Sequence, residues 1–558
     1  MTGGGSAWAD AARRWIAADP DPETRAEVEA LLAGGDGAAL EERFAGRLAF
    51  GTAGLRAPMG AGPLRMNRLV VRHAAAGIAR WLCGEVPGAA AAGVLVAHDA
   101  RHRSASFAAD CAEVLAAHGL PVIHSDGPLP TPVAVFAHGR AGTAAAVVVT
   151  ASHNPPGDNG LKLYGPDGAQ IVPPADAAIA AAIDAVAADG EVVPAGVPAE
   201  VRALPATLVD AYVAATLARV PRPPAPVAVA LTAMHGVGGA PARRLLEAAG
   251  AGRVHVVGAQ IDPDPDFPTV PFPNPEEPGA TDLLAARMRE TGAPLGLALD
   301  PDADRVGVLV AAPEGPRQLT GDEVGALLAE WLLAHVVRGP DRLVVSSVVS
   351  SRLPARIAAA HGAHHRETLT GFKWLCRPAM ENPGWTQVLA YEEALGYAIG
   401  PDVRDKDGLS AALAVAAMTG TLAAEGRTPL GLLDDLHRRH GAHVQDNFSL
   451  RDEAPGAAAR RDALLGRLMA APPAALAGLA VRACDLPAPD VLRIDLDGDV
   501  RVVVRPSGTE PKLKCYCEAR EPVAPGAPVE HARTRARERL AAVRGALAAL
   551  LVPAPSGR

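Results

Sequence analysis

Apolar and polar positions follow two periods along the chain, and these periods predict its elements. Short runs of apolar, mostly β-branched residues predict buried strands, and Ala/Leu-rich stretches with a period near 3.6 predict the helices between them. Because such strands and helices alternate through most of the chain, we expect an α/β protein with parallel or mixed sheets. The strand candidates are residues 94–97, 147–149, 227–231, 295–299, 343–345 and 388–391.

The two ends of the chain differ from this pattern. Residues 7–48 form a helical lead without strands. Near the other end, LRIDLDGDVRVVVRPSGTE has the spacing of a hairpin around Asp497 and Gly498, and an Arg/Ala-rich helix follows at about residues 528–551. This section therefore predicts an α+β terminal domain.

Length and linkers indicate several domains. The chain has 558 residues, which corresponds to roughly three to five domains of typical size. Stretches rich in Pro, Gly and polar residues near 194–205, 313–323 and 441–456 are candidate linkers.

Charge, hydropathy and cysteine content exclude some classes of protein. The formal net charge is -9 and the isoelectric point is about 6.0, so nothing indicates binding to nucleic acid or to anionic lipid. No run reaches 18 apolar residues and the N-terminus lacks a signal-peptide layout, so we expect a cytoplasmic protein. Six scattered cysteines do not form a disulfide framework, and Cys515 and Cys517 are predicted to be core thiols.

Lysine is rare in this chain, so each lysine position is a candidate for a specific role. Of the 53 basic residues, five are lysines, and all lie in or beside Gly-rich loops. A compact, mobile ammonium suits contact with phosphate or transfer of a proton. The five are Lys162, Lys373, Lys406, Lys512 and Lys514.

The first polar loop is TASHNPPGDNGLK, which follows the apolar run at 147–149. In open α/β sheets ligands bind at the carboxyl ends of strands. Ser152 is therefore either a turn-forming residue or a nucleophile offered to a substrate, and His153 and Lys162 lie beside it.

The second loop, DPDADR, carries three alternating aspartates. Asp300, Asp302 and Asp304 repel one another unless a cation joins them, and hard oxygen ligands favour Mg²⁺. Arg305 adds a planar fork suited to phosphate. IDPDPDFP at 261–268 has the same spacing, but its prolines hold the backbone extended, so we expect a solvated loop there.

Two further loops carry polar groups. YEEALGYAIGPDVRDKDG contains Glu392, Glu393 and Lys406, whose side chains suit sugar hydroxyls or a solvated turn, and GFKW places Lys373 in a short loop. RPSGTEPKLK offers a phosphate nest without a Walker sequence. Its candidate phosphate ligands are Arg505, Ser507, Gly508, Thr509 and Lys512. Arg56, in GTAGLR, fits either a further phosphate contact or a surface turn.

Four ordered motifs, TASHNPPGDNGLK, DPDADR, YEEALGY and RPSGTEP, resemble the signature loops of the α-D-phosphohexomutases, the group that contains phosphoglucomutase and phosphomannomutase. GTAGLR and GFKW extend the resemblance, which covers roughly residues 45 to 520. The sequence is similar to the branch that also includes phosphopentomutase and glucose-1,6-bisphosphate synthase.

The resemblance implies four domains around a central cleft, three of them α/β with mixed sheets and a C-terminal α+β domain. The expected domains are 1–205 with the phosphoserine loop, 206–318 with the metal-binding loop, 319–440 with the sugar-binding loop and 441–558 with the phosphate-binding loop. Expected partners are small-molecule sugar phosphates, with no nucleic acid and no membrane, and the chain is expected to be a monomer or homodimer.

The resemblance also implies roles for the loop residues. Ser152 is expected to be stored as phosphoserine and to share Mg²⁺ with Asp300, Asp302 and Asp304, with Lys162 or His153 as proton carrier and Arg56 beside them. Arg505, Ser507, Gly508, Thr509 and Lys512 are expected to hold the distal phosphate. The expected substrate-binding residues are Arg305, Lys373, Glu392, Glu393 and Lys406.

The implied activity is transfer of a phosphoryl group between the 1- and 6-positions of a glucose or mannose phosphate, through a sugar bisphosphate that also acts as activator. The alternatives are a phosphopentomutase, a bisphosphate synthase, or a sugar-phosphate-binding protein without catalysis; a serine hydrolase is disfavoured because GxSxG is absent. One departure concerns the preferred sugar. Related enzymes commonly carry serine two residues after the sugar-reading Glu392, where this chain has Ala394.

Overall fold

The computed structural model describes residues 4–190, 192–194, 197–451, 457–506 and 512–551. The chain forms two compact units. Unit 1 comprises Met1–Leu319 and Ala394–Thr421, and unit 2 comprises Thr320–Glu393 and Leu422–Arg558.

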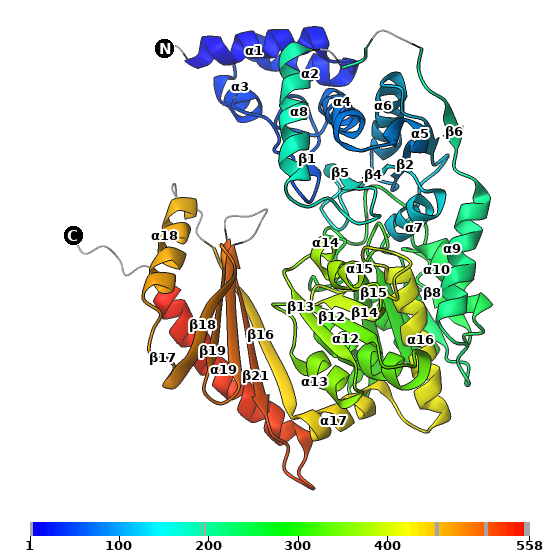
Figure 1. The fold of residues 1–558 in the computed structure, drawn as a ribbon, viewed down its shortest axis with the longest axis vertical. Helices are drawn as coiled ribbons and strands as arrows, with labels where there is room; N and C mark the ends of the chain where they lie inside the picture. Colours follow the sequence, from blue (N-terminus) through cyan, green and yellow to red (C-terminus); the bar gives the residue numbers. More distant parts are fainter. Residues whose placement is uncertain (1–3, 191, 195–196, 452–456, 507–511, 552–558) are drawn as a thin grey trace. The chain divides into compact units, whose positions relative to one another are not determined.

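Unit 1 contains the helical lead and two mixed sheets (Figure 1). Its helices are α1 (Gly4–Ala18), α2 (Pro22–Gly34), α3 (Gly37–Phe44), α4 (Arg68–Glu85), α5 (Ala89–Ala92), α6 (Ser104–Ala117), α7 (Thr131–Ala141), α8 (Ala175–Asp189), α9 (Ala206–Arg219), α10 (Gly239–Ala248), α11 (Asp282–Thr291) and most of α16 (Gly408–Ala424). Its strands are β1 (Leu55–Pro58), β2 (Val94–His98), β3 (Val122–His124), β4 (Ala145–Val149), β5 (Asp158–Tyr164), β6 (Val201–Ala203), β7 (Val229–Thr232), β8 (Val254–Val256), β9 (Leu295–Leu299), β10 (Val306–Ala312), β11 (Gly315–Gln318) and β15 (Gly396–Ile399).

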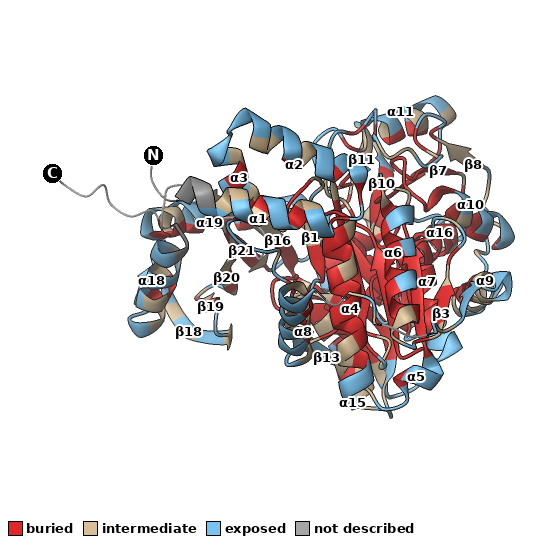
Figure 2. Ribbon diagram, turned by 90° about the horizontal axis from the view of Figure 1, so that it is seen from above, coloured by how far each residue is buried: buried red, intermediate tan, exposed pale blue. Residues whose placement is uncertain are grey.

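The first sheet has the order β1-β5-β4-β2-β3-β6. Strands β2, β3, β4 and β6 run parallel, whereas β5 is antiparallel to β4 and β1 is antiparallel to β5. Every residue of β2 and β4 is buried, because helices α6 and α7 both pack on these two strands and a strand covered in this way is apolar throughout. Figure 2 shows the buried strands inside and the exposed residues on the outer faces of the helices.

The second sheet has the order β11-β10-β9-β7-β8. Strands β7, β8 and β9 are parallel, and β9 turns back through a six-residue loop into antiparallel β10, with Leu299 opposite Val306. The loop lies at the carboxyl end of a fully buried strand. It contains the three aspartates.

Unit 2 contains a small parallel sheet and a larger antiparallel one. Its helices are α12 (Gly321–Trp331), the π-helical turn η1 (Leu332–Val336), α13 (Leu353–Ala360), α14 (Phe372–Leu375), α15 (Arg377–Glu381), α17 (Pro429–His440), α18 (Ala457–Ala470) and α19 (Val529–Leu551). Its strands are β12 (Arg342–Ser347), β13 (His364–Thr368), β14 (Thr386–Glu392), β16 (Ala442–Arg451), β17 (Ala475–Leu476), β18 (Leu479–Ala488), β19 (Val491–Leu496), β20 (Val500–Pro506) and β21 (Lys512–Glu521).

In unit 2, β12 pairs in parallel with β13 on one side and β14 on the other. The C-terminal sheet has the order β16-β21-β20-β19-β18-β17, and α19 packs along β16 and β21 (Figure 1). One face of α19 closes this core, because Ala536, Leu540, Val543 and Leu547 recur at helical spacing and are almost fully buried.

The observed elements confirm the predicted fold class and strand positions. The helical lead is three helices, α1 to α3. The predicted hairpin is β19 and β20, and the terminal helix is α19. Cys515 and Cys517 are buried in the C-terminal core as predicted. The central cleft and the four domain boundaries remain predictions.

Among the residues that the structure describes, no single helix is long and apolar enough to cross a membrane. One bent pair of helices, α16 and α17, meets the criteria of length and composition together.

Candidate active site

The loop after β4 presents Ser152 in an unusual backbone conformation. Ser152 has a φ of 53°, in the left-handed region that few non-glycine residues adopt, and its side chain is only 2% exposed. Its amide donates to Thr150 Oγ1 at 2.8 Å. The Ser152 hydroxyl donates to Asp300 Oδ2 at 3.2 Å and lies 3.3 Å from His153 Nδ1. The hydroxyl therefore faces the aspartate loop.

Arg101, from the loop after β2, holds the serine loop in this shape. Its buried guanidinium donates to the carbonyl oxygen of Ser152 at 2.6 Å and to that of Pro155 at 2.8 Å, and it also donates to the Asn154 carbonyl. Its Nε lies 3.4 Å from Asp99 Oδ2. One planar cation thus satisfies several carbonyl groups of a loop that has no regular hydrogen-bond ladder.

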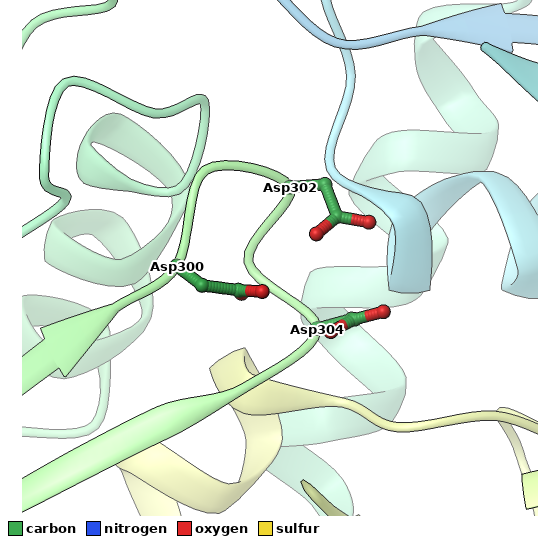
Figure 3. A group of neighbouring side chains, drawn as sticks. All are labelled: Asp300, Asp302 and Asp304. Carbon is green, nitrogen blue, oxygen red and sulfur yellow. The ribbon is translucent and has the colours of Figure 1, made fainter. Parts of the chain in front are cut away.

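The three aspartates between β9 and β10 converge (Figure 3). Asp300, Asp302 and Asp304 are all fully buried, and one carboxylate oxygen from each lies within 4.8 Å of the others. Ala303 has a φ of 58°, which tightens the loop so that alternate side chains point to one place. Thr131, at the start of α7, donates its hydroxyl to Asp302 Oδ2 at 2.6 Å.

Two lysines neutralise part of this negative charge. Lys162 on β5 places its Nζ 2.7 Å from Asp302 Oδ2 and 2.6 Å from Asp304 Oδ2. Lys406 lies 3.3 Å from Asp304 Oδ2 and 3.2 Å from Asp405 Oδ1. Burial opposes ionisation of Asp304, but Lys162, Lys406 and Arg305 outweigh it and hold the pKa of Asp304 below its usual value. Burial, and then the charges of Asp304 and Asp302, raise the pKa of Asp300.

The donor set fits a small divalent cation. Asp302 Oδ1 and Asp304 Oδ1 are buried and accept no hydrogen bond from any residue that the structure describes, which is costly unless another group satisfies them. Carboxylate oxygens gathered in this way are hard ligands of the kind that Mg²⁺ takes. Within the described residues, this is the one group of three or more His, Cys, Asp or Glu side chains with metal-binding spacing. The spacing-matched segment at 261–268 does not form one.

Two arginines and a histidine surround Ser152 and the triad. Arg56 lies on β1, opposite Gly160 of β5, and its Nη1 donates to Asn154 Oδ1 at 3.2 Å. Arg305 donates to the Ala394 carbonyl at 3.1 Å. Burial, together with the charges of Arg305 and Arg56, holds the pKa of His153 well below its usual value, so the ring is neutral near pH 7.

The remaining predicted residues with described positions lie in unit 2. Glu392 ends β14 and is buried. Glu393 accepts from the Ser347 hydroxyl at 3.3 Å, and its amide donates to Ser350 Oγ at 3.1 Å. Lys373 lies on α14 and Lys512 begins β21.

Arg505, near the end of β20, donates to Thr370 Oγ1 at 2.6 Å. The C-terminal sheet therefore approaches the loop that leads into α14 and Lys373. Ser507, Gly508 and Thr509, the other predicted phosphate ligands, lie outside the described residues.

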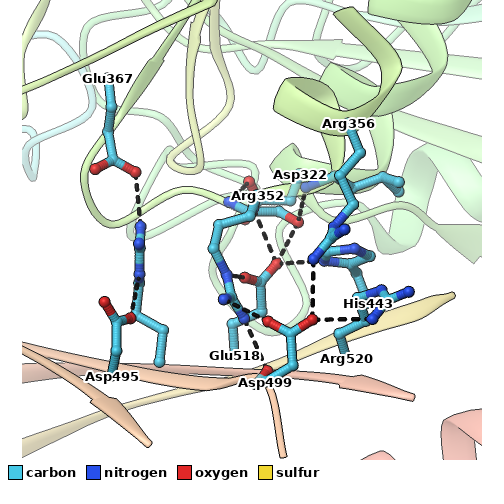
Figure 4. A network of polar contacts seen from close by, with 12 residues as sticks. Asp322, Arg352, Arg356, Glu367, His443, Asp495, Asp499, Glu518 and Arg520 are labelled. Atoms are coloured by element: carbon cyan, nitrogen blue, oxygen red, sulfur yellow. Dashed lines mark hydrogen bonds and ion pairs between the residues drawn. The ribbon is translucent and has the colours of Figure 1, made fainter. Parts of the chain in front are cut away.

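A buried polar network joins α13 to the C-terminal sheet (Figure 4). Glu518 on β21 accepts from the Ser351 hydroxyl at 2.5 Å, from Arg352 Nε at 2.5 Å and from His443 Nδ1 at 2.9 Å. Arg352 also donates to Asp499 at 2.7 Å. Asp322 accepts from the Ser351 amide at 2.6 Å and the Tyr391 hydroxyl at 2.9 Å.

Three residues that shape this site, Asp99, Arg101 and Thr131, were not predicted from the sequence. Asp99 and Arg101 follow a buried strand, as Ser152 does, so the same strand-end signal was available for them. Thr131 begins a helix and has no such signal; only the fold brings it to Asp302.

The order of the domains and the loops that they carry define a class of enzyme. The sequence matches the four domains of the phosphoglucomutase/phosphomannomutase family in their order along the chain. Residues 47–189 match α/β/α domain I, 210–314 match α/β/α domain II, 320–439 match α/β/α domain III and 462–527 match the C-terminal domain. The chain is thus a phosphomutase, an isomerase-type phosphotransferase. It belongs to the phosphoglucomutase/phosphomannomutase family.

Relatives named for different substrates match most of the chain. A probable phosphomannomutase of Haemophilus influenzae is 39% identical over 82% of this chain and 93% of its own length. A probable phosphoribomutase of Schizosaccharomyces pombe is 36% identical over 91% of this chain and 92% of its own. The crystal structure of a phosphoglucomutase/phosphomannomutase family protein from Burkholderia thailandensis has the same fold, with a TM-score of 0.70 and 23% identity over 91% of this chain and 98% of that one.

Proposed function

We propose that this enzyme moves a phosphoryl group between the 1- and 6-positions of a glucose or mannose phosphate, through a phosphoserine at Ser152 and a bisphosphorylated sugar. The observation that carries the proposal is the contact of the Ser152 hydroxyl with Asp300 at 3.2 Å, inside a buried cluster of three carboxylates and two lysines. Phosphoryl transfer depends mainly on in-line positioning and on neutralised charge, and this cluster suits both.

In the proposed cycle the bond between phosphorus and the Ser152 oxygen breaks while a bond forms to a free hydroxyl of the sugar monophosphate. The hydroxyl releases a proton, and the serine oxygen takes one up. The bisphosphate then turns around and returns its other phosphate to Ser152, which releases the isomeric monophosphate. Lys162 or His153 carries the proton, and removal of the carrier is expected to lower kcat by about 100-fold or more.

Asp300, Asp302, Asp304 and the oxygen of Ser152 would hold Mg²⁺. When bound there, the ion would offset negative charge on the phosphoryl group. Arg56 and Arg305 extend this positive charge toward the transferred group, while Glu392, Glu393, Lys373 and Lys406 contact the sugar. Arg505 and Lys512, with Ser507, Gly508 and Thr509, hold the second phosphate.

A pentose phosphate is the second candidate substrate. The similarity over 91% of the chain to a probable phosphoribomutase favours it, and Ala394 removes a hydroxyl that related hexomutases commonly carry beside the sugar-reading glutamate. A site without one hydrogen-bonding group discriminates less strongly between sugars that differ by one hydroxyl.

The test compares glucose 1-phosphate, mannose 1-phosphate and ribose 1-phosphate side by side, each with its bisphosphate as activator. We expect the highest kcat/KM for a hexose phosphate; a preference for ribose 1-phosphate would replace the first candidate by the second.

Ser152→Ala is expected to abolish turnover and to keep sugar-phosphate affinity. Ser106→Ala, at an exposed serine on α6, is the matched control. If the active wild-type enzyme never shows phosphate on the peptide that contains Ser152, the mechanism is wrong.

A further inference from the structure

A large cavity lies in unit 1 among α1, the segment after α3, α4 and α8. It is open to solvent and has a volume of about 1220 Å³, ample for a small organic molecule. These elements lie near the N-terminus of the chain (Figure 1). None of the lining residues belongs to the proposed active site.

Three aromatic side chains belong to the lining of the cavity. Trp15, Phe44 and Phe50 line it, and each is less than a tenth exposed. The rings of Trp15 and Phe44 meet edge to face, with centroids 6.1 Å apart. Aromatic rings of this kind offer apolar contact area to a ligand.

The charged residues of the lining are mainly basic. Arg14, Arg47 and Arg72 line it, against one acidic residue, Asp184. Asp110 and Glu113 bind the guanidinium of Arg72 and compensate its charge. Arg47 donates one hydrogen bond, to the Ala187 carbonyl at 3.3 Å, and Arg14 makes no hydrogen bond or ion pair with any residue that the structure describes. Arg14 and Arg47 are both exposed at the rim of the lining, and their charge is available to a ligand.

His73 adds a further polar group to the lining. Its side chain is 9% exposed and lines the cavity, yet its ring has no hydrogen-bond partner in the described part of the chain. Ring nitrogens that line a cavity in this way can exchange hydrogen bonds with water or with a ligand. Burial and the charge of Arg47 lower the pKa of His73 to about 4, so the neutral ring offers one donor and one acceptor.

We propose that this cavity is a second ligand site, which binds an organic anion that carries an aromatic ring. The ring lies on Trp15, Phe44 and Phe50, and the anionic group contacts Arg14, Arg47 and His73. Arginine forks bind phosphate, carboxylate and sulfonate groups in this way. This site is independent of the mutase chemistry.

The experiment is a fluorescence titration of the full chain with 8-anilinonaphthalene-1-sulfonate, a flat aromatic anion, and with N-phenyl-1-naphthylamine, its uncharged counterpart. We expect one saturable site per chain that prefers the anion. Arg14→Ala and Arg47→Ala are each expected to weaken the anion about tenfold, the loss that follows when one charge-assisted hydrogen bond is removed. Higher salt should weaken it as well.

Arg13→Ala is the matched control. Arg13 is the neighbour of Arg14 on α1 and is exposed like it, but Arg13 pairs with Asp10 and does not line the cavity. Ala180→Phe, which fills the cavity from α8, should block both probes. Unchanged mutase activity in these variants shows that they fold. Equal affinity for the two probes, or binding by Arg14→Ala and Arg47→Ala as tight as in wild type, would overturn the proposal.

Discussion

At the scale of single residues, the candidate active site depends on contacts between side chains from separate strands. Ser152, Lys162 and Arg56 come from a loop and two strands of one sheet, and the register of β5 against β4 brings Lys162 to the aspartates. The sequence placed Lys162 near Ser152, but it could not show that the ammonium pairs with Asp302 and Asp304, because that pairing depends on how the two sheets of unit 1 meet.

Arg101 carries the first prediction at this scale. Arg101→Lys keeps the positive charge beside Asp99, but all its donors lie on one nitrogen and cannot reproduce the contacts that Nη1 and Nη2 make with separate carbonyls of the serine loop. We expect the free energy of unfolding to fall by about 1–3 kcal/mol and kcat to fall at least tenfold, because Ser152 is no longer held in place. Denaturant unfolding and steady-state kinetics measure the two effects. Arg244→Lys, at an exposed position on α10, should change stability by less than about 0.5 kcal/mol; an equal loss in both variants would contradict the role of Arg101.

At the scale of elements, the apolar pattern predicted the strands and helices closely, but it did not predict the polar network of unit 2. The run at 295–299 fixed β9 at its observed bounds, and three alternating aspartates marked its loop. By contrast Glu518, Arg352 and His443 carry no local signal, since their partners lie far apart in the sequence and meet only when α13 packs near β21. A sequence records periodicity within an element better than contacts between elements.

Asp322, in the first turn of α12, supports a prediction about pH. Burial raises the pKa of Asp322 to about 7 despite the hydrogen bonds from Ser351 and Tyr391, whereas in the unfolded chain an aspartate titrates near 4. Between these values the folded protein keeps a proton that the unfolded chain has released. The contribution of Asp322 therefore favours the folded state most at the acidic end, and this contribution to the free energy of unfolding of unit 2 falls by roughly 4 kcal/mol as pH rises from about 4 to about 7.

The matched pair for this effect is Asp322→Asn and Asp282→Asn, the second at an exposed helix start on α11. Denaturant titrations at pH 5.5 and 8 should show that Asp322→Asn loses part of the pH dependence of wild type, while Asp282→Asn retains it. Identical pH dependence in all three proteins would mean that Asp322 is ionised in the folded state.

At the scale of the whole molecule, the chain is divided into two compact units, and the aspartate triad lies in unit 1. We expect at least two transitions in calorimetric unfolding, because large chains of several domains seldom unfold in one step. Mg²⁺ at a concentration of 100 times its dissociation constant should stabilise unit 1 by about 2.7 kcal/mol. It should therefore raise the midpoint temperature of one transition only. In Asp302→Asn this shift should disappear, and chelation should abolish mutase activity in wild type. A shift of both transitions, or none, would argue against a metal site confined to unit 1.

The left-handed backbone at Ser152 has one further consequence. Threonine carries the same hydroxyl, but its branched β-carbon clashes at a φ of 53°. The fold itself thus selects among alcohols of similar reactivity, and the choice of amino acid at the proposed phosphoryl acceptor reflects main-chain geometry as well as chemistry.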